Sequence, residues 1–151
     1  MNTVLKLILA SLLTQLWIAC GNQVPLTGGP RDESPPVLDT LESTRNNQIR
    51  FEKQPINLTF DEFVNLRDAS KQILISPPLD KPPIINSRLK KVSVAFDEDE
   101  VLKENATYVI NFGNSIVDFN EGNKLENYTF VFSTGDYIDS LSIKGLSLIH
   151  I

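Results

Sequence analysis

Thr107-Tyr108-Val109-Ile110-Asn111-Phe112 is the stretch that decides the fold, because large apolar residues alternate in it with smaller or polar ones. Alternation with a period of two predicts a β-strand that turns one face to a core and the other to solvent. The same alternation recurs at residues 56–61, 92–97 and 128–133, and it directs Thr59, Thr129 and Ser133 outward. Four such strands indicate antiparallel sheets with one wet side.

Weaker strand signals and turn residues complete this pattern. Shorter strands are expected at residues 37–41, 48–51, 72–76 and 84–87. Pro77-Pro78 and Pro82-Pro83 exclude helix and limit strand pairing on both sides of a loop, and residues 97–100 and 121–123 are polar turns. About seven short strands predict an all-β fold, an antiparallel Ig-like β-sandwich. The only Trp, Trp17, and the only Cys, Cys20, lie in the N-terminal segment, so we expect Phe, Tyr and aliphatic residues to form the core.

The N-terminal segment has the features of a secretory signal, predicted over residues 1–19. Lys6 precedes a mostly apolar run over residues 7–18, which is shorter than the about 20 residues that span a bilayer. Trp17-Ile18-Ala19-Cys20 resembles the lipobox of bacterial lipoproteins. That resemblance implies a diacylglycerol thioether on Cys20 and cleavage before it. The alternative is an ordinary secretory signal in which Cys20 is an incidental thiol.

Composition limits the partners of the mature protein. The whole chain has a net charge of −5, and loss of Lys6 with the signal leaves 13 basic and 19 acidic residues. This balance argues against a nucleic-acid binder, which needs a basic face. It also argues against electrostatic adsorption to anionic lipid and leaves the acyl group as the membrane attachment. Residues 20–36 are rich in Gly and Pro and are predicted to form a flexible, lipidated tether.

Several longer motifs resemble a known family. They are Gly28-Gly29-Pro30-Arg31-Asp32, Phe60-Asp61-Glu62-Phe63-Val64, Ile116-Val117-Asp118-Phe119-Asn120-Glu121-Gly122-Asn123 and Phe130-Val131-Phe132-Ser133-Thr134-Gly135-Asp136. Over residues 28–145 the chain resembles lipoproteins of the Bacteroidetes group and the bacterial Ig-like domain also found in the surface-layer protein SbsA. The resemblance implies a non-catalytic Ig-like β-sandwich, placed at residues 37–137, on a cell-envelope lipoprotein.

The C-terminal residues 138–151 are interpreted as the start of a missing second domain followed by a foreign tail. Residues 140–145 look like the first strand of a further β-sandwich, and residues 146–151 look like the translation of a sequencing adapter. We therefore expect a truncated chain in which His150 is not native. The alternative is a genuine final strand, because Leu146, Leu148 and His150 alternate.

No catalytic set is predicted, and neither is a cofactor or a metal site. The single His150 cannot complete a nucleophilic triad, and a zinc site lacks His and Cys ligands. Asp97-Glu98-Asp99-Glu100 is interpreted as a solvated turn in preference to a calcium site. Asp118, Asn120 and Glu121 are weak calcium candidates, because their spacing departs from an EF-hand loop; the alternative is a hairpin turn. Asp61 and Glu62 point to opposite faces of a strand, which argues against an acid–base pair.

Short motifs suggest modifications. Asn57, Asn105 and Asn127 begin Asn-x-Thr sequons, which would matter in a eukaryotic secretory protein. Residues 39–41 and 139–141 match a short O-glycosylation pattern known in Bacteroidetes, with Thr40 and Ser140 as the modified residues. A chance match to three residues is the alternative.

The sequence as a whole favours a lipid-anchored cell-envelope protein, at the periplasmic face or the outer surface of the outer membrane. Its partners would be the membrane, through the anchor, and an envelope protein or glycan, but not nucleic acid. The first alternative is a receptor subunit for carbohydrate or protein, which needs an exposed aromatic platform; Phe63 and Phe119 are the residues to test. The second alternative is an enzyme whose catalytic domain lies beyond the truncation.

Overall fold

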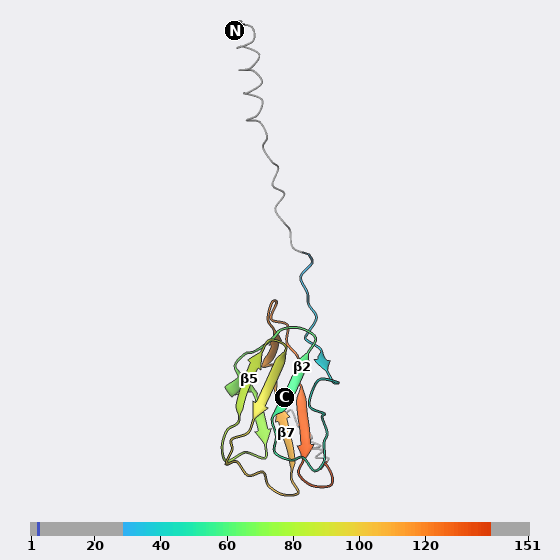
Figure 1. Cartoon of the computed structure of the whole chain (residues 1–151), viewed down its shortest axis with the longest axis vertical. Coiled ribbons are helices and arrows are strands. Elements are labelled where there is room, and N and C mark those ends of the chain that lie inside the picture. The colour runs from blue at the N-terminus through green and yellow to red at the C-terminus, as the bar shows by residue number, and fades with distance from the viewer. Residues whose placement is uncertain (1–2, 4–28, 140–151) are drawn as a thin grey trace, which may run out of the picture. The chain divides into compact units, whose positions relative to one another are not determined.

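The computed structural model describes residue 3 and residues 29–139. Contacts divide the chain into Met1–Arg31 and Asp32–Ile151, and the second unit contains the folded domain. Its strands are β1 Leu38–Asp39, β2 Ile56–Phe60, β3 Val64–Leu66, β4 Leu74–Ser76, β5 Ile84–Arg88, β6 Lys91–Ala95, β7 Thr107–Asn111, β8 Ile116–Asp118 and β9 Thr129–Ser133, with one helical turn, α2 Ala69–Gln72 (Figure 1).

Two antiparallel sheets form a sandwich. One has the order β1-β2-β6-β5 and the other the order β4-β7-β9. If the seven strands are lettered along the chain, these are the A-B-E-D and C-F-G sheets of the constant-type immunoglobulin arrangement. The predicted all-β, antiparallel Ig-like sandwich is therefore confirmed. β3 and β8 form a short third pair. In the sequence, β3 lies between strands B and C, and β8 lies between strands F and G.

The core fills the space between the sheets with the residues that the alternation directed inward. Fully buried side chains come from both sheets: Ile56, Leu58, Val92 and Val94 from one, and Tyr108, Ile110, Phe130 and Phe132 from the other. The Tyr108 and Phe132 rings stack at 5.1 Å, and Phe51 packs on Phe132 at 4.2 Å. Aromatic contacts thus occupy the interior of the domain. Residues 29–139 contain no cysteine, so no disulfide links them.

Tyr108 also fixes the loop before its own strand. Its side chain is buried at the start of strand F, and its hydroxyl accepts a hydrogen bond from the backbone N–H of Lys103 at 2.9 Å. This is the tyrosine corner that many sandwiches of this class use to hold the E–F connection. The residue was predicted as core, but the polar role of its hydroxyl was not.

Some predicted strands differ from the observed elements. Residues 48–51 form only an isolated parallel bridge, between Gln48 and Phe132. The segment predicted as a strand from residue 72 starts at Leu74, because Ala69–Gln72 close a helical turn first. The β3-β8 pair was not predicted, since each strand has three residues and shows no clear alternation.

Two residues that the alternation directed outward are buried, and that prediction is wrong for both. Thr59 lies beneath the turn after β1, where its N–H donates to Ser43 Oγ at 2.8 Å and its hydroxyl donates to the Glu42 carbonyl at 3.3 Å. Ser133 is covered by the segment around Gln48 and Phe51. In both cases an irregular segment covers the outer face of the strand.

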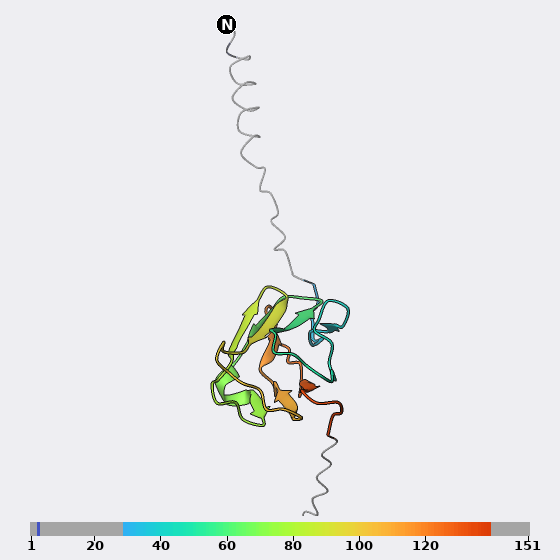
Figure 2. The same cartoon turned by 60° about the horizontal axis from the view of Figure 1, so that its bottom comes forward.

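The chain enters and leaves the domain at opposite ends of the sandwich. At the end that we call proximal, Val37 and Asp61 exchange hydrogen bonds, and β3, β8 and the β5–β6 turn lie at the same end. At the distal end, Asp139 is hydrogen-bonded to Thr107, the first residue of β7. Figure 2 shows the first and last described residues of the domain at its top and bottom.

Candidate interaction surfaces

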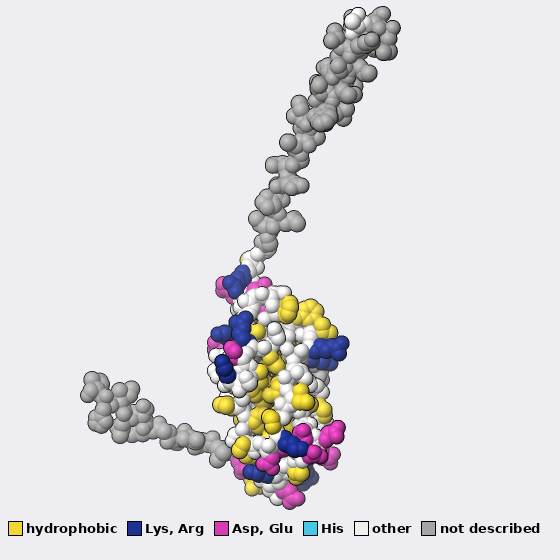
Figure 3. Space-filling model, turned by 90° about the vertical axis from the view of Figure 1, so that its left-hand side faces the viewer, with side chains coloured by type: hydrophobic (Ala, Val, Ile, Leu, Met, Phe, Trp, Pro, Cys, Tyr) yellow, Lys and Arg dark blue, Asp and Glu magenta, His cyan; other side chains and the backbone are white. Residues whose placement is uncertain are grey.

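An apolar groove runs along the open side of the sandwich, between the edge strands β4 and β5. It has a volume of about 560 Å³. Apart from Ser70, the residues that line it are aliphatic or proline, and they include Ile73, Ile75, Pro78, Leu79, Pro83 and Ile85. Figure 3 shows hydrophobic side chains gathered along the middle of this face. The two proline pairs predicted as strand breakers thus contribute to the wall of the groove.

A second apolar surface lies at the proximal end. Phe63 precedes β3 and Phe119 follows β8, and the Phe119 N–H donates to the Phe63 carbonyl at 2.9 Å. Their side chains are 50% and 67% exposed, and Leu89 in the β5–β6 turn is 66% exposed. All three line one shallow depression. We call Phe63, Leu89 and Phe119 the proximal patch.

The polar loop beside this patch is organised by Asp118. Its carboxylate is buried, and its two oxygens accept the backbone N–H groups of Glu121, Gly122 and Asn123 at 2.6–2.9 Å. Burial opposes ionisation, but these N–H groups hold the pKa of Asp118 below its ordinary value. Gly122 takes a φ of 80°, which favours glycine.

The calcium interpretation requires the Asp118 carboxylate as a ligand, but three backbone N–H groups already surround that carboxylate. This geometry is that of a tight hairpin turn. The Asn120 side chain is exposed and Glu121 is half-buried, so the three weak calcium candidates differ in surroundings. Among residues 29–139, no group of three His, Cys, Asp or Glu side chains is placed to hold a metal ion.

Asp61 and Glu62 were predicted on the edge of a strand, but they lie in the bend between β2, which ends at Phe60, and β3, which begins at Val64. Asp61 accepts the Val37 N–H at 2.8 Å and is exposed. Glu62 is half-buried; burial raises its pKa, and the negative charges of Asp118, Asp61, Asp32 and Glu121 raise it further. Glu62 therefore lies in an acidic surrounding at the proximal end.

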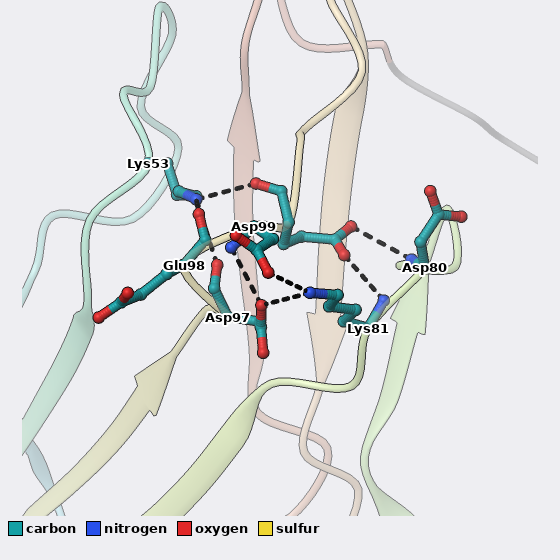
Figure 4. Close-up of polar contacts among 7 residues, drawn as sticks. Lys53, Asp80, Lys81, Asp97, Glu98 and Asp99 are labelled. Atoms are coloured by element: carbon teal, nitrogen blue, oxygen red, sulfur yellow. Dashed lines mark hydrogen bonds and ion pairs between the residues drawn. The ribbon is translucent and has the colours of Figure 1, made fainter.

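The acidic run Asp97–Glu100 is held by two lysines at the distal end (Figure 4). Lys53 Nζ donates to the carbonyls of Asp97, Glu98 and Glu100 at 2.6–3.1 Å, and Lys81 Nζ pairs with Asp97 and Asp99 at 3.0 and 2.7 Å. The buried Glu100 carboxylate accepts the N–H groups of Asp80 and Lys81. The run is thus a turn tied to the β4–β5 loop.

The predicted modification sites lie in different settings. Thr40 is exposed in the turn after β1, which Asp39 holds by accepting the N–H groups of Leu41 and Glu42. Asn105 and Asn127 have φ values of 50° and 52°, a conformation in which Asn is common. Cys20, Ser140 and His150 lie outside the described residues. No helix within the described part of the chain is long and apolar enough to cross a membrane.

Comparison with known proteins places the domain in a family. The family described as bacterial Ig-like domain matches residues 32–134. No curated protein and no solved structure matches the chain. The matched region begins at Asp32, whose carbonyl accepts a hydrogen bond from the Asn123 side chain, and it ends just after β9. Fold topology and family match agree, and the chain belongs to the bacterial Ig-like domain family.

Proposed function

We propose that this protein is a lipid-anchored cell-envelope protein, of the kind found in Bacteroidetes, whose Ig-like domain acts as a spacer and an interaction module. Domains of this family are non-catalytic in general and are often found in extracellular or envelope proteins. The lipobox-like sequence that ends at Cys20 supports the anchor, and two or more acyl chains give stable attachment where one does not.

The observation that carries the spacer role is the separation of the two ends of the domain. The chain joins the sandwich beside Asp61 and leaves it beside Thr107. A domain with this arrangement separates the membrane anchor from any segment that follows by the length of the domain itself. Its core of interlocked aromatic and aliphatic side chains makes it a stiff element.

The groove between β4 and β5 supports the interaction role. It lies on the open side of the sandwich, where both neighbouring strands are sheet edges with unpaired backbone groups. Its lining, which is aliphatic or proline except for Ser70, suits an apolar protein segment better than a sugar. A protein-binding receptor subunit is therefore the second candidate, and a substitution such as Ile75→Lys would weaken that binding.

Metabolic labelling with an alkyne fatty acid tests the anchor. The wild-type protein and a Thr27→Ala control in the predicted tether should be labelled and recovered with membranes. Cys20→Ala should be unlabelled, because it removes the only thiol of the chain. Equal labelling of Cys20→Ala and wild type would refute the proposal. Protease treatment of intact cells then distinguishes the cell surface from the periplasmic face.

A further inference from the structure

We propose that the proximal patch is a membrane-docking surface, which enters the interface of the bilayer that holds the anchor. The inference rests on the proposed function, since it requires lipid on Cys20. It goes further by assigning an orientation: the domain would rest on the membrane through Phe63, Leu89 and Phe119. Three features support this orientation, namely exposure, backbone conformation and the point at which the tether joins the domain.

The patch exposes three large apolar side chains at one end of a stable domain. Phe63, Leu89 and Phe119 are each at least half exposed, and they line a common depression. Their backbones are linked, because Phe119 N–H donates to the Phe63 carbonyl and Val64 N–H donates to the Leu89 carbonyl, both at 2.9 Å. The side chains are therefore held together on a rigid base. Phe and Leu are residues that surface-bound proteins bury at the boundary of headgroups and acyl chains.

Leu89 stands where a hairpin usually has glycine or asparagine. It is the first residue of the two-residue turn between β5 and β6, and its φ is 55°. A bulky residue in this left-handed region is uncommon and costs conformational energy. The Leu89 side chain regains little by burial in the domain, because 66% of it is exposed. Insertion into lipid supplies a reason for leucine at this position.

Basic side chains flank the patch on one side. Arg88, Lys90 and Lys91 surround Leu89 in the hairpin, and Lys90 Nζ lies 5.9 Å from the centre of the Phe63 ring. Asp61 and Glu62 lie on the other side of Phe63, so the proximal end as a whole is not cationic. Lys90 Nζ also donates to the Asp61 carbonyl at 2.5 Å. We therefore attribute docking to apolar insertion, with Arg88 and Lys91 contacting phosphate groups.

The point at which the tether joins the domain places the patch next to the membrane. Residues 21–31 separate Cys20 from Asp32, so the chain between them spans at most about 40 Å. Asn123 binds the Asp32 carbonyl, and Asp61 binds Val37. These contacts lie within a few residues of Phe119 and Phe63. A short tether attached here raises the effective concentration of the patch at the lipid surface, which favours lipid over a partner protein.

The test uses the lipidated full chain with one added cysteine. Leu89→Cys places a maleimide-linked environment-sensitive fluorophore in the patch, and Val101→Cys, 80% exposed in the β6–β7 loop, places it at the distal end. Each protein is reconstituted into vesicles of phosphatidylethanolamine and phosphatidylglycerol that contain a lipid with a spin-labelled acyl chain. Docking predicts blue-shifted, quenched emission at residue 89 and water-like, unquenched emission at residue 101.

Substitutions test the patch itself. In the Leu89→Cys protein, Phe63→Ser with Phe119→Ser should lower the ratio of docked to free domain roughly tenfold or more, because apolar burial is lost. Ile49→Ser with Val101→Ser, two exposed apolar residues away from the patch, should leave that ratio unchanged. A melting curve for each variant shows that the domain remains folded.

The outcomes separate the docking proposal from the anchor on which it rests. The chain without an added cysteine should take up no maleimide, because lipid occupies the Cys20 sulfur. Uptake there, with no fatty-acid label, would refute the anchor and docking together. Anchored protein with equal emission at residues 89 and 101 would refute docking alone. Shielding of residue 89 in cells but not in vesicles would also overturn it and would indicate a protein partner.

Discussion

The Tyr108 hydroxyl lies 2.9 Å from the backbone nitrogen of Lys103, and this contact joins the core to the loop that precedes strand β7. Tyr108 reaches this loop from between the sheets, where its ring stacks on Phe132. One residue therefore fixes both the packing of the core and the path of the β6–β7 connection. Tyr128 provides the contrast, because its hydroxyl is the one buried side-chain polar atom without a partner among the described residues.

Tyr108→Phe and Tyr128→Phe should therefore have different effects on stability. The first leaves the Lys103 N–H without its acceptor and should lower the free energy of unfolding by about 1–2 kcal/mol. The second removes an unpaired buried hydroxyl and should be neutral or stabilising. Urea unfolding measures both, with the exposed Tyr137→Phe as control. Equal losses for Tyr108→Phe and Tyr128→Phe would contradict this account of the tyrosine corner.

Asp118→Asn should destabilise the β8 hairpin. The charged acceptor of three N–H groups is lost, at a cost of about 1–3 kcal/mol at pH 7. The folded-state pKa of Asp118 is lowered, so its contribution is present above the unfolded value of about 3.9 and is lost as the pH falls through the folded value. The difference between variant and wild type should therefore shrink in acid. Asn120→Ala, exposed in the same loop, should change stability by less than about 0.5 kcal/mol.

Calcium should leave the melting temperature unchanged. The N–H groups that converge on Asp118 occupy the carboxylate that a calcium ion would need. Scanning calorimetry with millimolar calcium or with a chelator measures this directly. A rise in melting temperature that grows with calcium concentration, and that Asp118→Asn abolishes, would instead support the calcium interpretation.

Glu62→Gln should raise stability at neutral pH. Burial and nearby carboxylates raise the folded-state pKa of Glu62. For an acid shifted in this direction, the stabilising contribution is present below the unfolded pKa of about 4.3 and is lost as the pH rises through the folded value. The gain from the neutral amide should therefore appear at pH 7 and vanish below about pH 4. Unfolding curves at both pH values measure it, and the exposed Glu104→Gln should show no such difference.

Leu89→Gly should stabilise the isolated domain although it removes a large apolar side chain. Glycine relieves a positive φ that costs a side-chain-bearing residue about 1–2 kcal/mol, while the added freedom of the unfolded chain costs about 0.4–1 kcal/mol. The net gain should lie between about 0 and 1.6 kcal/mol in denaturant unfolding. Val101→Gly, at an exposed position without positive φ, should give no gain. A loss at Leu89→Gly would show that leucine stabilises the hairpin itself.

The sequence by itself determined the fold class and most of the core. Leu58, Val92, Ile110 and Phe130 lie in the four alternating segments, and all of them are buried as the period of two predicted. Such a period assigns each residue to a face from its neighbours along the strand, so this information is local. The same local information, with the proline pairs, marked the ends of the strands.

The tertiary structure alone decided what covers each strand and which loops meet. Thr59 and Ser133 are buried because segments distant in sequence lie over them, and a period of two carries no information about such cover. The proximal patch unites Phe63, Leu89 and Phe119 from three separate loops, and the groove unites β4 with β5 across the open side. Each of these features is a contact between residues far apart in the chain, so only the packing of the two sheets determines it.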